Sequence, residues 1–171
     1  ICTPSDENET RKLLTTAYLH NGPASVRYPR GTGPNSNVDK DLKPLKIGEA
    51  NIINEESSEI VILNFGTLLN EANQISKELK ATLVDMRFVK PLDEKLLRKL
   101  FKKAKVFISI EDGSIMGGAG SAVQEFASKE NLNVRSILFG IPDKFIEHAS
   151  REEMLVEAGL DVENIKSKLS K

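Results

Sequence analysis

The chain has 171 residues, a length that fits one ordinary domain with some additional sequence. Hydrophobic residues make up 39% and charged residues 29%, which are ordinary values for a globular protein. Lys and Arg number 24 and Asp and Glu 25, so the formal net charge of −1 gives no electrostatic reason to expect nucleic acid or an anionic membrane as a partner. No apolar run is long enough to span a bilayer, and we expect no secretion signal. The single cysteine, Cys2, can form no internal disulfide, which favours a cytoplasmic location.

The first thirty residues predict a strand end, a helix and a short strand. Ser5 is the predicted N-cap of the helix, and Asp6 and Glu7 lie favourably near its N-terminal dipole. Apolar residues then recur at helical spacing, at Leu13, Leu14, Ala17 and Tyr18. Ala24 to Tyr28 is the predicted strand. These elements cannot bury a core of their own, so we expect them to be loosely held unless they dock onto another part of the protein.

Pro and Gly residues punctuate residues 31–46, which predicts a linker. Strands and helices then alternate over residues 47–171, which we expect to form one complete domain. The predicted strands are Ile47–Ile53 (at an edge), Ile60–Phe65, Thr82–Met86, Val106–Ile110 and Val134–Phe139. The predicted helices are Leu68–Leu79, Asp93–Lys103, Ala119–Ser128, Glu152–Gly159 and Val162–Leu169. This alternation requires right-handed crossovers and predicts an α/β fold with three layers and a mainly parallel sheet.

The first candidate site is Ser25 to Gly31, at the end of a predicted strand. Ligands gather at the carboxyl ends of strands in open α/β sheets, and Arg27 and Arg30 suit a phosphate. The alternative is an arginine that is solvated or ion-paired beside a linker, because most arginines at strand ends bind no ligand.

The second candidate is the glycine-rich turn from Glu111 to Ser121, between a predicted strand and a helix. Its glycines would let backbone N–H groups approach an anion. The spacing matches neither a dinucleotide-binding motif nor a P-loop, and Glu111 and Asp112 would repel a phosphate. Tight packing of helix against strand, or a subunit contact, is therefore the favoured interpretation.

The remaining polar residues give little support for catalysis. A structural salt bridge is the default interpretation for Asp85 and Arg87 at a strand end. His20 is predicted at a helix end, and His148 in a loop beside Glu147. Neither histidine has a second histidine or a cysteine at metal-ligand spacing, and no nucleophile elbow is present.

Motifs along the whole chain resemble the 1-deoxy-D-xylulose-5-phosphate synthase family of the transketolase group. They are Thr3–Glu9, Val26–Gly31, Leu63–Thr67, Ala81–Asp93, Ile115–Ser121, Gly140–Asp143 and Glu152–Met154. The resemblance implies an enzyme that uses thiamine diphosphate and Mg²⁺ to condense pyruvate with D-glyceraldehyde 3-phosphate. Carbon dioxide leaves, and the product supplies isoprenoid, thiamine and pyridoxal synthesis. The family works as a homodimer.

The resemblance also implies that the chain is one part of that enzyme. Residues 1–30 match the end of the family's pyrimidine-binding domain and residues 47–171 its transketolase C-terminal domain, and the chain opens on Ile1 without an initiator methionine. The family's Gly-Asp-Gly…Asn motif for metal and diphosphate, its activating glutamate and its proton-moving histidines are absent. We therefore expect no catalytic, cofactor-binding or metal-binding residue in this chain, no bound cofactor and no activity of the chain alone.

The resemblance assigns one role to this chain, the binding of the aldehyde's phosphate. That role goes to Arg30, with Arg27 as the second choice. Two alternatives stay open. One is an assembly domain of a transketolase or of a two-oxoacid dehydrogenase beta subunit, which share this type of C-terminal domain. The other is a small free-standing α/β protein that binds an anion at its glycine turn.

Overall fold

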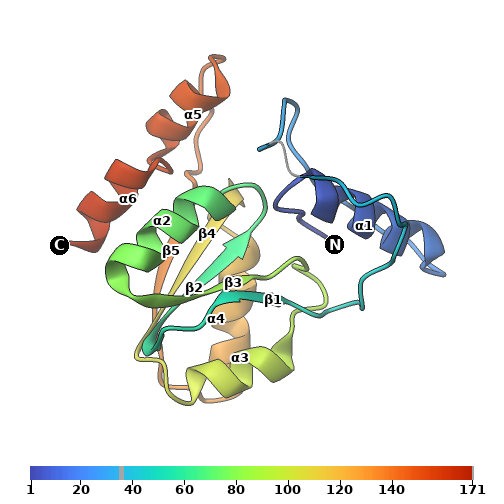
Figure 1. Ribbon diagram of the computed structural model, residues 1–171. Coiled ribbons are helices and arrows are strands. Elements are labelled where there is room, and N and C mark those ends of the chain that lie inside the picture. The colour runs from blue at the N-terminus through green and yellow to red at the C-terminus, as the bar shows by residue number, and fades with distance from the viewer. Residues whose placement is uncertain (35–36, 171) are drawn as a thin grey trace.

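The computed structural model describes residues 1–34 and 37–170, and its centre is a five-stranded sheet covered by helices (Figure 1). The strands are β1 (Asn51–Asn54), β2 (Ser57–Phe65), β3 (Ala81–Asp85), β4 (Val106–Ser114) and β5 (Arg135–Ile141). Their order in the sheet is β1-β3-β2-β4-β5, and only the edge pair of β1 and β3 is antiparallel. The predicted α/β fold with a mainly parallel sheet is confirmed. The predicted edge strand Ile47–Ile53 is shorter than expected, because Gly48 takes a left-handed backbone conformation with a φ of 74°.

One face of the sheet is covered by α3 (Glu94–Phe101) and α4 (Ala119–Lys129). Alternate residues of β2 reach this face, namely Val61, Leu63 and Phe65, all fully buried. The rings of Phe101 and Phe107 stack at a centroid distance of 5.0 Å and join α3 to β4.

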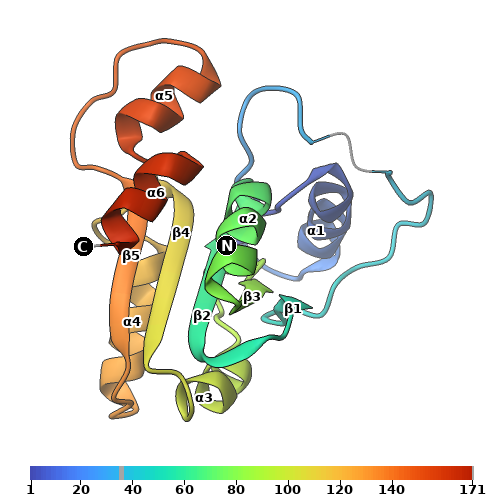
Figure 2. The same ribbon diagram turned by 60° about the vertical axis from the view of Figure 1, so that its left-hand side comes forward.

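The opposite face is covered by α2 (Leu69–Leu79), α5 (Arg151–Ala158) and α6 (Val162–Leu169). Ile62 of β2 and Ile75 of α2 are buried here together with Ile165 of α6. Figure 2 shows α2 and α6 in front of the sheet and α4 behind it. The predicted three layers are therefore confirmed. No helix in residues 1–34 or 37–170 has the length and apolar character needed to cross a membrane.

The N-terminal helix α1 (Glu7–Leu19) lies beyond the β1 and β3 edge of the sheet (Figures 1 and 2). Its N-cap is Asp6, whose carboxylate accepts from the backbone N–H of Glu9 at 2.7 Å. The prediction of Ser5 as N-cap is wrong because the Ser5 hydroxyl donates instead to Asp85, at 2.6 Å.

The strand predicted at Ala24–Tyr28 is also wrong, since only one isolated bridge forms there, between Val26 and Cys2. Cys2 also bridges to Phe88, and this second bridge ties the N-terminal segment to the residues that follow β3. The side chains of Cys2, Leu13 and Phe88 form one small buried cluster. The N-terminal segment has no core of its own, as expected, and it docks onto the sheet domain at Phe88.

The sheet reverses its winding direction at β2. The chain passes from β2 to its neighbour β3, and then crosses to β4 on the other side of β2. In open α/β sheets, ligands bind outside the carboxyl ends of the strands at such a switch point. Phe65 of β2 lies opposite Glu111 of β4 in the register, so the residues just beyond this pair line the crevice.

Candidate functional site

Asp112 stands at the switch point and holds two groups from distant parts of the chain. Its Oδ1 lies 3.1 Å from Nη1 of Arg27, which also donates to the Asp112 carbonyl oxygen at 2.8 Å. Its Oδ2 accepts from the hydroxyl of Thr67, just beyond β2, at 2.8 Å. Asp112 thus joins the N-terminal segment to the carboxyl ends of β2 and β4.

Arg151, the first residue of α5, extends this network. Its Nη2 donates to Oγ1 of Thr67 at 3.0 Å. The Thr67 hydroxyl therefore donates its single hydrogen to Asp112 and accepts from Arg151 through one of its lone pairs. Three separate elements meet at this edge of the sheet through a continuous chain of polar contacts.

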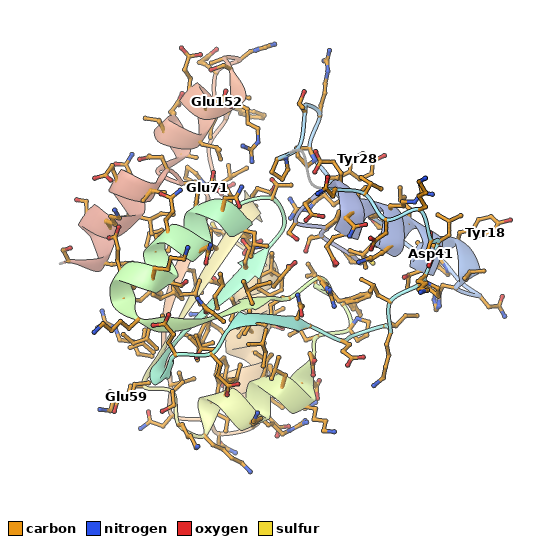
Figure 3. The ribbon with its side chains drawn as sticks, in the orientation of Figure 1. Tyr18, Tyr28, Asp41, Glu59, Glu71 and Glu152 are labelled. Atoms are coloured by element: carbon orange, nitrogen blue, oxygen red, sulfur yellow. The ribbon has the colours of Figure 1, made fainter. Side chains whose placement is uncertain are left out.

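A cavity of about 470 Å³ opens beside the network. In Figure 3, Tyr28 and Glu152 mark the N-terminal segment and α5, between which the cavity lies. Its cationic lining is Arg27, Arg30, Lys144 and Arg151, and its apolar wall includes Ile141, Phe145, Ile146, Met154, Leu155 and Ala158. Asp112 is the one carboxylate in the lining, and it is already engaged by Arg27 and Thr67.

The two predicted phosphate-binding residues differ in their surroundings. Arg27 is ion-paired with Asp112, which matches the alternative of a structural arginine. Arg30 is exposed and lines the cavity, and it makes no hydrogen bond or ion pair within residues 1–34 and 37–170. Arg27 and Arg30 thus line the same cavity, and of these two arginines only Arg30 has all its guanidinium N–H donors available for a ligand. Phosphate binding itself stays a prediction.

The glycine-rich turn is filled by the protein's own carboxylate. Glu111 is buried, and its two oxygens accept from the backbone N–H groups of Ala119 and Gly120, each at 2.9 Å. A Cβ added at Gly120 would lie 2.4 Å from Oγ of Ser109, so tight packing of α4 on β4 is confirmed. An anion already occupies this helix N-terminus, and the turn therefore does not fit the diphosphate of thiamine diphosphate. Sequence analysis placed Glu111 directly after a predicted buried strand but did not predict that its carboxylate caps the N-terminus of α4.

Arg87 forms a partly buried ion pair, but its partner is not Asp85. It binds Glu9 of α1 in a bidentate manner, with Nε–Oε2 at 2.7 Å and Nη2–Oε1 at 3.0 Å. The expected salt bridge is thus a contact between the N-terminal segment and the sheet domain. Sequence spacing gave no sign of it, because Glu9 and Arg87 lie far apart in the chain.

Asp85 is a buried carboxyl group at the end of β3. Burial raises its pKa to about 6, and the charge of Glu9 acts in the same direction. The hydrogen bond from Ser5 and the charge of Arg87 oppose this rise. Asp85 therefore titrates nearer to neutrality than an ordinary carboxyl group does.

Neither histidine contributes to a site. His20 follows α1 and His148 precedes α5, and both are exposed. Within the described ranges, no group of three or more His, Cys, Asp or Glu side chains could hold a metal ion. The described residues therefore do not fit a magnesium and thiamine diphosphate site.

Comparison with known proteins gives one family and a consistent set of relatives. The family model of the transketolase C-terminal domain matches residues 48–165. The 1-deoxy-D-xylulose-5-phosphate synthase of Pseudomonas fluorescens (strain Pf0-1) is 50% identical over 161 residues, 94% of this chain and 25% of the relative. The enzyme of the same name from Pseudomonas syringae pv. tomato is 46% identical over 170 residues, 99% of this chain and 27% of the relative. The chain thus spans about a quarter of the length of the curated relatives it matches.

A solved structure described as a split gene transketolase, an inactive beta4 tetramer, superimposes with a TM-score of 0.85. The two sequences are 26% identical, and the superposition covers 97% of this chain and 55% of the transketolase chain. The resemblance inferred from the sequence motifs is confirmed, and the chain belongs to the transketolase C-terminal domain family.

Proposed function

We propose that this chain is the C-terminal part of a thiamine-diphosphate-dependent synthase that makes 1-deoxy-D-xylulose 5-phosphate and CO₂ from pyruvate and D-glyceraldehyde 3-phosphate. The observation that carries the proposal is identity of 46% to 51% to relatives with that name, over nearly the whole chain. The identity includes the N-terminal segment as well as the sheet domain. The transketolase alternative is weaker, because the transketolase structure is only 26% identical.

The role proposed for this chain is to hold the phosphate of the aldehyde through Arg30. A guanidinium forks two hydrogen bonds to a phosphate, and pyruvate carries no such group. Arg27 is the weaker candidate because its guanidinium is held by Asp112 at 3.1 Å. In the longer protein, the cofactor and Mg²⁺ would be bound by segments outside this sequence, in a cytoplasmic homodimer that supplies isoprenoid, thiamine and pyridoxal synthesis.

The chain alone should make no product and should show no saturable binding of thiamine diphosphate. The support is that the family's cofactor motifs match no part of this sequence. Titration calorimetry of the chain with Mg²⁺ and the cofactor is the test. A micromolar dissociation constant, which corresponds to about −8 kcal/mol, would contradict the proposal.

A chimera tests the proposed reaction directly. The matching C-terminal quarter of the Pseudomonas fluorescens (strain Pf0-1) relative would be replaced by this chain, since the two are 50% identical over 161 residues. We expect the chimera to form 1-deoxy-D-xylulose 5-phosphate, and a chimera that carries a transketolase C-terminal domain at the same place to be inactive. A folded chimera with this chain that makes no product would argue against the proposal.

The same chimera isolates the role of Arg30. Arg30→Ala should lower kcat/KM for the phosphorylated aldehyde by roughly 30- to 1,000-fold, with a raised KM, because a charge-assisted pair to the phosphate is lost. Aldehydes without a phosphate should lose far less. Equal losses for both kinds of aldehyde would mean that Arg30 acts through structure.

A further inference from the structure

The four cations of the cavity beside Asp112 fall into two classes. Arg27 has a carboxylate partner in Asp112, and Lys144 has one in Glu157, with Nζ 3.4 Å from Oε1. Arg30 and Arg151 have no carboxylate partner within residues 1–34 and 37–170. Two uncompensated guanidinium groups therefore face the same cavity, one from the N-terminal segment and one from α5.

Arg151 is held in place by a neutral group. Its contact with Thr67 uses one of five guanidinium N–H donors and leaves its charge unbalanced. Thr67 is itself fixed by Asp112 at 2.8 Å, so one end of the guanidinium is oriented while other donors stay open. A planar fork held in this way suits a phosphate, because little side-chain entropy is lost when the anion binds.

The position in the fold favours a ligand at this place. Thr67 and Asp112 lie at the carboxyl ends of β2 and β4, on the two sides of the switch point of the sheet. The apolar wall of the cavity, which includes Met154 and Leu155, keeps part of the lining away from water and thereby strengthens charge interactions inside it.

A neighbouring cavity of about 400 Å³ does not compete for an anion. It shares Tyr28, Pro29 and Arg151 with the first cavity, but Asp6, Glu7 and Glu71 also line it. Three carboxylates there disfavour a phosphate. The charge distribution thus directs an anion to the side of Arg151 that faces Arg30.

We propose that Arg151 joins Arg30 in binding the phosphate of a small phosphate monoester in the 470 Å³ cavity. This inference rests on the proposed function, since it adds a second phosphate-binding residue to the same substrate. It places that residue on the transketolase C-terminal domain, to which the family resemblance assigned no site residue. Lys144 lines the cavity but belongs to its ion pair with Glu157 rather than to the site.

The test is a titration of the 171-residue chain with sn-glycerol 3-phosphate at constant ionic strength, followed by NMR, with glycerol as the neutral control. The variants are Arg30→Met, Arg151→Met and, as a matched control that removes one cation from the same cavity, Lys144→Met. We expect the first two to weaken binding by about tenfold each and Lys144→Met by less than about threefold. Glycerol should not bind.

The outcomes separate this inference from the assignment of Arg30. A loss with Arg30→Met but none with Arg151→Met overturns the inference and leaves Arg30 in place. No loss with either variant overturns both. An equal loss with Lys144→Met and Arg151→Met overturns the inference as well, because general electrostatic attraction would then account for the effect.

One more variant tests whether Arg151 acts only by holding the network together. Thr67→Val removes the hydrogen bond to Arg151 and keeps the guanidinium charge. It should weaken binding less than Arg151→Met does. If both variants cause the same loss, Arg151 acts through structure and the inference fails.

Discussion

The sheet domain and the N-terminal segment are stabilised in different ways. The sheet buries a large apolar cluster on each face, built from neighbouring strands and helices. Residues 1–30 contribute Cys2 and Leu13 to a small buried cluster with Phe88, and they also dock through polar contacts at Ser5, Glu9 and Arg27. Local hydrophobic pattern thus specifies one region, and a few long-range contacts specify the other. The cavity of the candidate site exists only where the two regions meet.

The largest expected effect is the loss of an aromatic ring from the sheet domain. Phe107 is fully buried and stacks on Phe101, so Phe107→Ala should lower the free energy of unfolding by about 3–5 kcal/mol. Phe145→Ala removes the same ring from a fully exposed position and should change stability by less than about 0.5 kcal/mol. Urea unfolding of both variants measures the difference, and similar losses would contradict the assigned core.

Stability should also depend on the ionisation of Asp85, which lies between the two regions. Its pKa is raised from 3.8 to about 6 in the folded state, so the folded state holds the proton more tightly. The neutral carboxyl group contributes about 3 kcal/mol to the free energy of unfolding. This contribution is fully present below about pH 4 and is lost as the pH rises through about 6.

Urea unfolding between pH 4 and 8 tests this dependence. Asp85→Asn imitates the neutral carboxyl group and should remove the decline in stability between about pH 4 and 7. A decline of equal size in the variant would assign the titration to another group.

Removal of the ion pair between Glu9 and Arg87 should destabilise the docking of the N-terminal segment and leave the stability of the sheet domain unchanged. Arg87→Met removes a bidentate contact of 2.7 and 3.0 Å and leaves the mostly buried Glu9 carboxylate with a long ion pair to Lys12 at 4.0 Å, at a cost of about 2 kcal/mol. Trypsin should then cleave after Lys12 faster, with no change in the sheet domain. Lys105→Met, which removes an exposed pair with Glu59, is the control and should leave cleavage unchanged. Unchanged cleavage in Arg87→Met would show that the other contacts of the segment hold it without this ion pair.

The smallest effect should come from the helix cap at Glu111. Glu111→Gln keeps one acceptor oxygen for the N–H groups of Ala119 and Gly120, so one buried donor loses its partner, at about 1 kcal/mol. Glu153→Gln at the exposed cap of α5 is the matched control, with a cost of less than about 0.5 kcal/mol. Equal thermal unfolding temperatures for the two variants would contradict the burial assigned to Glu111.

The sequence predicted the sheet domain well and the N-terminal segment poorly, for a physical reason. Buried β-strands such as Ile60–Phe65 and amphipathic helices repeat on a scale of a few residues, so a local pattern reveals them. The partner of Arg87 and the hydroxyl of Ser5 depend on contacts between residues about eighty positions apart. The same limit applies to the site: sequence analysis identified Arg27 and Arg30 at a predicted strand end, whereas nothing in the local sequence linked Arg151 to them, more than a hundred residues away.

Hydrogen exchange of the backbone amides in α1 tests the docking of the N-terminal segment most directly. If residues 1–30 are held against Phe88, Asp85 and Arg87, the amides from Leu13 to Ala17 should exchange at least about 100-fold more slowly than in an unstructured peptide. They should still exchange faster than those of β2 and β4, and Arg87→Met should remove most of the protection. Exchange of these α1 amides at the rate of an unstructured peptide, in the unmodified chain, would contradict the account.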